Sequence, residues 1–284
     1  MKYFLLIFFP ILLSATISKG SSKLEADDTE TLQSLFDKGG VINLPANKSF
    51  NITKTLYLKN NDEIINGNLC IINYLGNGAA IDFKLVNNKI FPVRNVINNL
   101  NIIVHTDGAI GVRWQCSSSS LSNCAVALNG NNETAYEIVG DVNGTGSYYN
   151  IFENCFAQGT VHLGNNNQYG WKFTYNKSMP GRCANACTWI GGRVGQCDVG
   201  MYINGAGNVI NHMAAEGCNI AFYFDNNDSK VGCVSNQVVS PYVEKCKTAF
   251  KFGTNALACM ASTPFITGVP SVKEDSGVRN VYIP

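Results

Sequence analysis

Two glutamates, Glu216 and Glu244, have the spacing in this 284-residue chain that best suits acid–base chemistry. Each lies five residues before a copy of a recurring four-residue pattern, at Ala221 and at Ala249. If these copies are consecutive strands of one sheet, the two glutamates stack one strand spacing apart, about 4.8 Å. That is near the ~5–5.5 Å of a retaining glycosidase pair, and two close carboxylates raise the pKa of one of them. The spacing predicts a catalytic pair; the alternative is that both are solvated turn or edge residues.

The recurring pattern is small, apolar, variable, apolar, and it occurs seven times between residues 80 and 252. Successive copies start 21 to 35 residues apart, the length of one unit in a solenoid or another repeat fold. The alternation predicts a short strand whose second and fourth residues point inward and whose third points outward. The copies are Ala80-Ile81-Asp82-Phe83, Ala109-Ile110-Gly111-Val112, Ala135-Tyr136-Glu137-Ile138, Gly170-Trp171-Lys172-Phe173, Gly200-Met201-Tyr202-Ile203, Ala221-Phe222-Tyr223-Phe224 and Ala249-Phe250-Lys251-Phe252.

The outward residues of the last three copies form a second candidate site. Tyr202, Tyr223 and Lys251 would stack as a flat aromatic strip beside a cation, which suits a sugar ring with an acidic substituent. The alternative is simple cross-strand pairing, which stabilises a sheet by about 0.2–1 kcal/mol per pair. The earlier outward residues carry mixed charge, which argues against one continuous track for a polyanion; they are Asp82, Gly111, Glu137 and Lys172.

Composition excludes several function classes. The net charge is +1, from 21 basic and 20 acidic residues without charge runs, so neither a nucleic-acid nor a membrane partner is expected. No metal or cofactor is expected either, because zinc-type cysteine and histidine spacing is missing. The chain has 36 Asn and 27 Gly, the residues that adopt left-handed backbone in tight turns. This composition suits a fold with several turns in every coil.

The N-terminus predicts secretion. Residues 1–20 read as a signal peptide, with a lysine at position 2, an apolar run over residues 3–13 and small residues after it. The run is shorter than the ~20 residues that span a bilayer, which disfavours an uncleaved anchor. Glycosylation sequons, which matter only in a eukaryotic secretory pathway, follow at Asn47, Asn51, Asn132, Asn143, Asn176 and Asn227.

Secretion also permits disulfides, and the eleven cysteines leave at least one thiol unpaired. Cys116 with Cys124, and Cys183 with Cys187, bracket short segments and are candidate local bridges. Three other cysteines each precede a copy of the pattern by three residues, so we expect them to stack on successive coils as buried thiols. These are Cys197, Cys218 and Cys246.

The ends of the chain differ from its middle. Residues 27–40 predict a capping helix, with Asp27 and Glu30 at capping-box spacing and Gly39-Gly40 as a stop. Residues 41–255 predict the coils of a single domain spanning 21–284. Residues 256–284, which contain three prolines, predict a tail that closes the far end or wraps along the outside.

Residues 28–36, followed by Gly-Gly-Val-Ile-Asn-Leu-Pro-Ala, resemble the entry into the right-handed parallel β-helix of pectate-lyase-like proteins, a superfamily that includes phage tailspikes. Residues 189–203 and 211–222 are similar to coils of such domains. The resemblance covers residues 27–255. It implies an all-β, right-handed parallel β-helix of eight to ten coils with a short N-terminal capping helix. It also implies a polysaccharide partner and, as in many tailspikes, a homotrimer as one assembly to test.

The motifs of the best-known catalytic branches are missing. We find no Gly-His-Gly, no paired Asp-Asp beside Asn-Thr-Asp, no Arg-Ile-Lys and no Arg-x-Pro-x-x-Arg pattern of polygalacturonases and pectate lyases. Whether the chain is an enzyme therefore stays open. The expected function is a secreted protein that binds a polysaccharide and cleaves it by hydrolysis or by β-elimination. The alternative is a non-catalytic β-solenoid that acts as an adhesin, a coat component or a carbohydrate-binding module.

Overall fold

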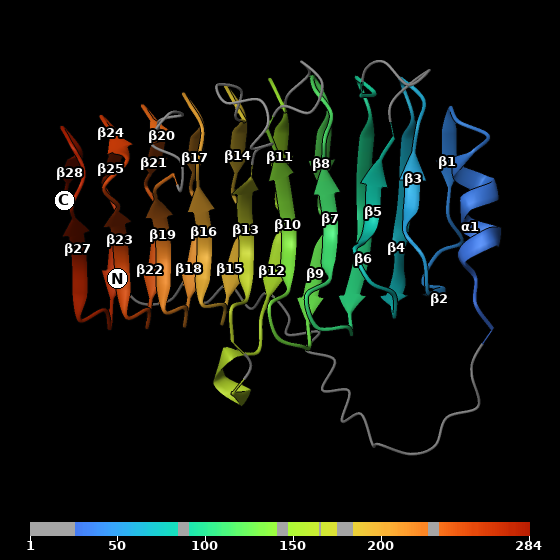
Figure 1. Ribbon diagram of the computed structural model, residues 1–284, viewed down its shortest axis with the longest axis horizontal. Helices are drawn as coiled ribbons and strands as arrows, with labels where there is room; N and C mark the ends of the chain where they lie inside the picture. Colours follow the sequence, from blue (N-terminus) through green and yellow to red (C-terminus); the bar gives the residue numbers. More distant parts are fainter. Residues whose placement is uncertain (1–25, 85–90, 141–146, 165, 175–183, 227–232) are drawn as a thin grey trace, which may run out of the picture.

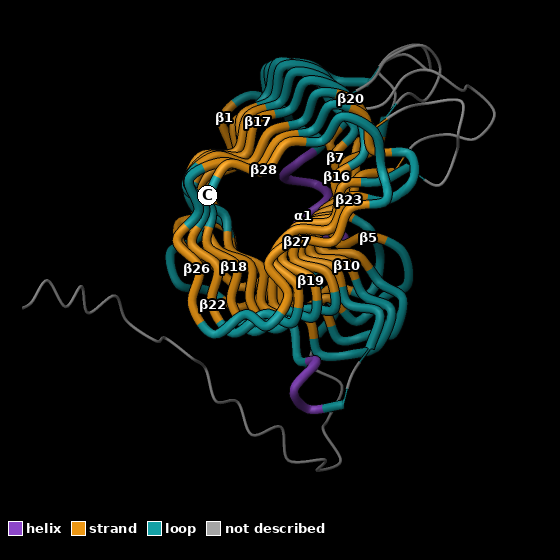
Figure 2. The backbone as a smooth tube through the Cα atoms, turned by 90° about the vertical axis from the view of Figure 1, so that its left-hand side faces the viewer, coloured by secondary structure: helices purple, strands orange, loops and turns teal. Residues whose placement is uncertain are grey.

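The computed structural model describes residues 26–84, 91–140, 147–164, 166–174, 184–226 and 233–284. These residues form a right-handed parallel β-helix, in which short strands stack as successive coils along one long axis (Figure 1). Viewed from the C-terminal end, the coils enclose one continuous core, and helix α1 lies across the far end (Figure 2). The fold predicted from the repeat is confirmed. The predicted signal peptide, residues 1–20, lies outside the described residues.

The coils have three faces. Face C is a nine-stranded parallel sheet with one strand for each coil, which agrees with the predicted eight to ten coils. Its strands are β3 (Leu56–Leu58), β5 (Ala79–Phe83), β7 (Ile110–Trp114), β10 (Thr134–Val139), β13 (Tyr169–Thr174), β16 (Val199–Ile203), β19 (Ile220–Phe224), β23 (Thr248–Phe252) and β27 (Ser271–Asp275).

The other two faces belong to one bent seventeen-stranded sheet. Face A contains β1 (Val41–Asn43), the first part of β4 (Ile64–Tyr74), the first part of β6 (Val96–Val104), β8 (Ser120–Ser122), β11 (Ile151–Glu153), β14 (Thr188–Ile190), β17 (Val209–Asn211), β21 (Gln237–Val239), β25 (Met260–Ser262) and β28 (Val281–Ile283). Face B contains β2 (Ser49–Ile52), the rest of β4 and β6, β9 (Ala125–Leu128), β12 (Phe156–Gln158), β15 (Arg193–Gly195), β18 (Ala214–Glu216), β22 (Tyr242–Glu244) and β26 (Phe265–Thr267).

Two small elements lie outside the three faces. A two-stranded sheet pairs β20 (Cys233–Val234) with β24 (Ala256–Leu257). The 3₁₀ helix η1 (Val161–Leu163) projects from the coil between β12 and β13 (Figure 1).

One or two left-handed residues bend each coil between face A and face B. Asn123, Asn154 and Gly191 hold this position in three successive coils, with φ between 47° and 64°. Asparagine and glycine tolerate this conformation best, which explains part of the unusual composition. Later coils place His212, Ser240 and Thr263 at the same corner, so the position does not demand Asn or Gly.

The repeated pattern forms the core of face C, as predicted. Its second and fourth residues are at most 3 % exposed in the copies that begin at 80, 135, 170, 200, 221 and 249. The small first residue is explained by close packing against face B: a Cβ on Gly170 would lie 2.9 Å from Val194 Cγ1 and 2.5 Å from the carbonyl oxygen of Gly200.

The sequence predicts one copy of the pattern two residues too early. Val112 pairs with Tyr136, and Arg113 pairs with Glu137, so the copy is Gly111-Val112-Arg113-Trp114 and the outward residue is Arg113, not Gly111. Both readings satisfy small–apolar–variable–apolar, and a two-residue shift preserves the alternation. Only the register of the neighbouring strands distinguishes them.

An internal asparagine ladder, which we did not predict, supports the corner between faces C and A. Asn208 Oδ1 accepts a hydrogen bond from Cys187 N at 3.0 Å, and Asn236 Oδ1 accepts one from Asn208 N at 3.1 Å. Asn150 and Asn280 make the same contact with the preceding coil. Buried backbone N–H groups need partners, and these side chains provide them.

Helix α1 (Thr29–Phe36) closes the first coil with Leu32 and Phe36, which are fully buried. The predicted capping box is absent. Asp27 Oδ1 accepts from Thr29 N at 3.0 Å, whereas Asp28, the residue at the helix start, pairs with Asn51 of β2. The carboxylate of Asp28 serves the strand edge instead of the helix.

The predicted boundary between the coils and a closing tail, at residue 255, is wrong. Strands β25 to β28 continue the ladders past residue 255, with Thr248 paired to Ser271 and Met260 paired to Val281. Pro264, Pro270 and Pro284 flank these strands rather than interrupt them, because proline is tolerated at strand ends.

The cysteines behave as core residues. Cys116 and Cys124 are free and buried, so the predicted bridge between them is wrong: each Sγ lies in its own inward position. Cys197, Cys218 and Cys246 stack on successive coils as predicted. Cys183 lies outside the described residues, so its pairing with Cys187 stays a prediction.

Candidate functional site

Glu216 and Glu244 lie directly opposite each other on face B, because β18 and β22 pair in register at these residues. The stacking predicted from their spacing is therefore present. Arg193, one coil earlier, binds the first of them: its Nε and Nη2 each lie 2.9 Å from Glu216 Oε2. Lys245 Nζ lies 2.8 Å from Glu244 Oε1, and the hydroxyl of Tyr242 donates to Glu244 Oε2 at 2.8 Å.

These contacts determine the electrostatics of the pair. Hydrogen bonds from Lys245 and then Tyr242 lower the pKa of Glu244 below its ordinary value. The sequence argument predicted that two close carboxylates would raise one pKa, and for Glu244 the opposite holds. For Glu244, the contacts with Lys245 and Tyr242 outweigh repulsion across one strand spacing.

Aromatic side chains share face B with the two glutamates. One outward column of face B contains, on successive coils, Phe156, Arg193, Ala214, Tyr242 and Phe265. Tyr242 and Phe265 stack with ring centroids 5.4 Å apart and ring planes 8° from parallel. They are 36 % and 61 % exposed, and Phe156 is 46 % exposed. The Tyr242–Phe265 pair is therefore a flat, exposed aromatic surface.

The second outward column of face B contains Gln158, Gly195, Glu216, Glu244 and Thr267. Gly195 lets the neighbouring side chains fold over the strand, because a Cβ there would lie 2.7 Å from Gln158 Oε1 and 3.2 Å from Arg193 Nη2. Arg193 Nη1 also approaches Gln158 Oε1 at 3.4 Å. These two columns, from Phe156 to Thr267, define the face-B site.

The second predicted site lies elsewhere, on face C. Tyr202, Tyr223 and Lys251 do stack on successive coils. The rings of the two tyrosines meet edge to face, with an interplanar angle of 80°, and Tyr202 is only 8 % exposed. Lys251 Nζ lies 5.1 Å from the ring centroid of Tyr223. The strip is therefore not the flat, open platform that the sequence suggested.

Face-C polar groups mostly pair with one another. The hydroxyl of Tyr223 donates to Asp225 Oδ2 at 2.9 Å, and Lys251 Nζ lies 3.8 Å from Glu274. Arg113 lies between Asp82 and Glu137, 3.2 Å and 2.6 Å away. The observed register thus places Arg113 in the outward column of face C, between two carboxylates.

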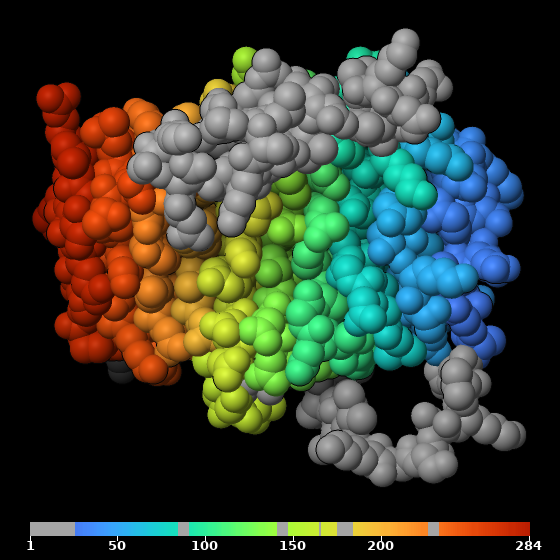
Figure 3. Space-filling view, viewed as in Figure 1, coloured from blue at the N-terminus to red at the C-terminus, as the bar shows by residue number. Residues whose placement is uncertain are grey.

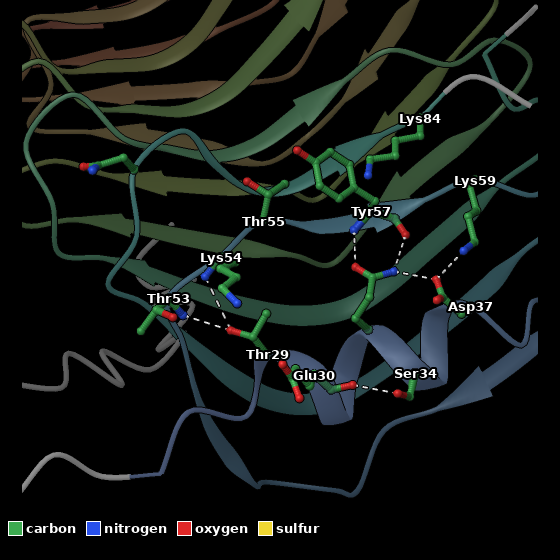
Figure 4. Close-up of a pocket in the computed structure, with 12 residues that line it drawn as sticks. Thr29, Glu30, Ser34, Asp37, Thr53, Lys54, Thr55, Tyr57, Lys59 and Lys84 are labelled. Carbon is green, nitrogen blue, oxygen red and sulfur yellow. Dashed lines mark hydrogen bonds and ion pairs between the residues drawn. The ribbon is translucent and has the colours of Figure 1, made fainter. Parts of the chain in front are cut away.

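A cleft of about 810 Å³ lies at the N-terminal end, between α1 and β3 (Figure 4). The side-chain amide of Gln33 pairs with the backbone of β3 there, in the way a neighbouring strand would. Its Oε1 accepts from Tyr57 N at 2.8 Å, and its Nε2 donates to Tyr57 O at 3.1 Å. Asp37 binds Lys59 at 2.9 Å, and Lys84 lies 3.9 Å from the ring centroid of Tyr57. These contacts attach the cap to the sheet.

Two features are absent among the described residues. No group of three or more His, Cys, Asp or Glu there could hold a metal ion. No helix among these residues is long and apolar enough to cross a membrane.

Comparison with known proteins shows the fold. No family model matches the sequence, and no curated protein matches it. An endo-xylogalacturonan hydrolase from Aspergillus tubingensis matches with a TM-score of 0.55 and 8 % identity, over 93 % of this chain and 92 % of that one. The tailspike protein of E. coli bacteriophage HK620, solved as an E372Q mutant with a pentasaccharide, matches with a TM-score of 0.50 and 10 % identity, over 91 % of this chain and 63 % of that one.

A third similar structure is Geobacillus virus E2 ORF18, with a TM-score of 0.50 and 11 % identity over 90 % of this chain. This chain spans 57 % of the length of that protein. The protein thus shares the parallel β-helix fold of these three structures, which are 8 to 11 % identical to it in sequence.

Sequence reasoning found the two glutamates and missed their neighbours. Tyr242 lies two residues before Glu244, and Phe265 takes the same place in the next coil. A period of two would have placed both on the glutamate face, had the strands of face B been recognised. The repeat predicts outward residues on face C alone, because all its copies lie in the strands of that face.

Proposed function

We propose that this protein binds a polysaccharide on face B. The observation that supports this most directly is the exposed, parallel Tyr242–Phe265 pair beside the stacked Glu216 and Glu244. Aromatic faces stack on sugar rings, and carboxylates accept hydrogen bonds from sugar hydroxyls. The secretion predicted from residues 1–20 agrees with an extracellular glycan and is part of the proposal.

Two tyrosine variants test which face binds. Native gels that contain a polysaccharide identify the glycans that retard the protein. Calorimetry with such a glycan should show about tenfold weaker binding for Tyr242→Ala than for the unaltered protein, equivalent to about 1.4 kcal/mol. Tyr223→Ala removes a tyrosine from the rival face C and should bind like the unaltered protein. Loss in Tyr223→Ala alone would move the site to face C, and no retention by any glycan would refute the proposal.

Hydrolysis is a second candidate, favoured by the register of Glu216 and Glu244. A retaining glycosidase needs one protonated carboxyl and one carboxylate. The lowered pKa of Glu244 suits the carboxylate. Glu216 would have to donate the proton, and its ion pair with Arg193 opposes that role. Binding without cleavage, as in an adhesin or a binding module, is therefore the better-supported function.

Cleavage is measured by new reducing ends, and β-elimination by the absorbance of unsaturated uronates. If the unaltered protein shortens a glycan without that absorbance, Glu216→Gln and Glu244→Gln should each lower the rate by at least a hundredfold. Shortening with absorbance would identify a lyase and exclude this pair as hydrolytic residues. Unchanged chain length in every glycan that binds would establish the non-catalytic reading.

A further inference from the structure

The charges of face B point to the kind of sugar that it accepts. We infer that face B binds a neutral polysaccharide, laid along the axis of the β-helix, and discriminates against uronic and sulfated chains. This inference deepens the proposed function and rests on it. Three observations carry it: the direction of the aromatic column, the placement of the carboxylates, and the absence of an available cation in the two columns.

The direction of the bound chain follows from the two columns. Phe156, Tyr242 and Phe265 occupy one outward position on different coils. Four coil-to-coil steps separate Phe156 from Phe265, or about 19 Å at roughly 4.8 Å per step. A single sugar ring cannot reach both ends of such a column. An oligosaccharide parallel to the axis would contact the aromatic column and the carboxylate column together.

The placement of the carboxylates disfavours anionic sugars. Glu216 and Glu244 follow one another in the second column, with side chains 33 % and 28 % exposed. A uronate laid over them would bring like charges together, whereas a hydroxyl could donate a hydrogen bond to either carboxylate. Glu244 stays ionised because its pKa is lowered, so the repulsion persists into mildly acidic solution.

The cations that contact Glu216 and Glu244 are already engaged in ion pairs. Arg193, the one cation among the described outward residues of β9, β12, β15, β18, β22 and β26, binds Glu216 and approaches Gln158. Lys245, in the turn after β22, binds Glu244. An anionic sugar would have to displace a protein carboxylate to gain an ion pair, while a neutral sugar needs no such exchange.

The test compares neutral, uronic and sulfated oligosaccharides of equal length on the purified full chain. We expect neutral chains to bind at least tenfold more tightly than uronic chains at low salt, with a narrower gap at high salt because screening weakens the repulsion. Affinity for neutral chains should rise with length until the ligand spans the column. Glu244→Gln should narrow the ratio of neutral to uronic affinity several-fold, because it removes a charge that repels uronates.

Glu153→Gln is the matched control, because Glu153 is an exposed outward carboxylate of β11 on face A. Glu153→Gln should leave the affinities for neutral and for uronic chains unaltered. Uronic chains that bind as tightly as neutral ones would overturn this inference while the proposed function stands. Failure of all three glycan classes to bind would overturn the proposed function itself. A loss of discrimination in Glu153→Gln equal to that in Glu244→Gln would show a general charge effect and also overturn the inference.

Discussion

Single residues on face B show how the environment decides the role of a carboxylate. Glu216 and Glu244 share one column and one residue type, yet the first is bound by Arg193 from the preceding coil and the second by Lys245 and Tyr242. The hydroxyl of Tyr242 also has its pKa raised, because it donates to the charged Glu244. The tyrosine thus links the aromatic column to the carboxylate column.

The first prediction separates these two roles of Tyr242. Tyr242→Phe keeps the ring and its stacking on Phe265 but removes the hydrogen bond to Glu244. The pKa of Glu244 should therefore rise toward its ordinary value, and the affinity for the glycan should change by less than about threefold. Carbon-13 NMR titration of the carboxyl group measures the first effect and calorimetry the second. An unchanged Glu244 titration would mean that Lys245 alone holds the charge.

Glu133, which is fully buried at the corner before β10, provides the second prediction. Its Oε2 accepts from Gly130 N at 2.7 Å, its Oε1 has no hydrogen-bond partner among the described residues, and burial raises its pKa to about 7. The folded protein then binds more protons than the unfolded chain between the ordinary glutamate pKa and about pH 7. Stability should fall as pH rises through this window and stay lower above it.

Glu133→Gln should remove that pH dependence. A neutral amide keeps the acceptor for Gly130 and loses the cost of ionisation, so the variant should be more stable at pH 8 by on the order of 2 kcal/mol and nearly unchanged at pH 4. Urea unfolding at both pH values measures it. Glu153→Gln, at an exposed carboxylate, serves as the control, and equal stability differences at the two pH values would contradict the assignment.

At the scale of elements, the asparagine ladder is the device that holds successive coils at the corner between faces C and A. Asn208 is fully buried and makes three kinds of contact: it accepts from Cys187 N, and its amide donates to Ala184 O at 3.1 Å and to Asn236 Oδ1 at 2.9 Å. Its neighbours in the ladder depend on it, because each asparagine serves the backbone of the coil before it.

The third prediction follows from these contacts. Asn208→Ala leaves the N–H of Cys187 buried without its partner and should lower the free energy of unfolding by about 2–4 kcal/mol. Asn211→Ala, in the same coil, is the matched control because Asn211 Oδ1 has no hydrogen-bond partner within the part of the chain that the structure describes. This variant should cost less than about 0.5 kcal/mol. Chemical denaturation compares the two, and equal losses would show that the ladder contributes nothing special.

At the scale of the molecule, the two ends of the β-helix are finished differently. The space-filling view shows the coils as successive bands along the axis (Figure 3). Helix α1 covers the first coil, where Gln33 and Asp28 pair with the edges of β3 and β2. Among the described residues, no element pairs with the far edge of β27 or β28. Charges on β27 and flanking prolines reduce the tendency of this edge to recruit another chain.

The fourth prediction concerns this asymmetry. In a solenoid each coil is stabilised by its neighbours, so among the described coils the one that holds β27 and β28, which pairs with a coil on one side, opens most easily. Hydrogen exchange should be faster in β26 to β28 than in β1 to β3. Leu32→Ala, which empties a fully buried position in α1, should cost about 2–5 kcal/mol and raise exchange in the first coils. Thr31→Ala, exposed on the same helix, should not.

The sequence by itself determined the fold class, because its repeat has the period of one coil and alternates as a strand. It also determined the stacking of Glu216 over Glu244 and of Tyr202 over Tyr223, since both pairs keep a constant offset from the repeat. The tertiary structure alone decided which copy was in register at Arg113, because a two-residue shift leaves the alternation unchanged. It also separated the two candidate sites onto different faces, because three corners per coil turn residues near in sequence in different directions. Only the assembled coils bring Arg193, Glu216, Tyr242 and Phe265 onto one surface, and that surface carries the proposed function.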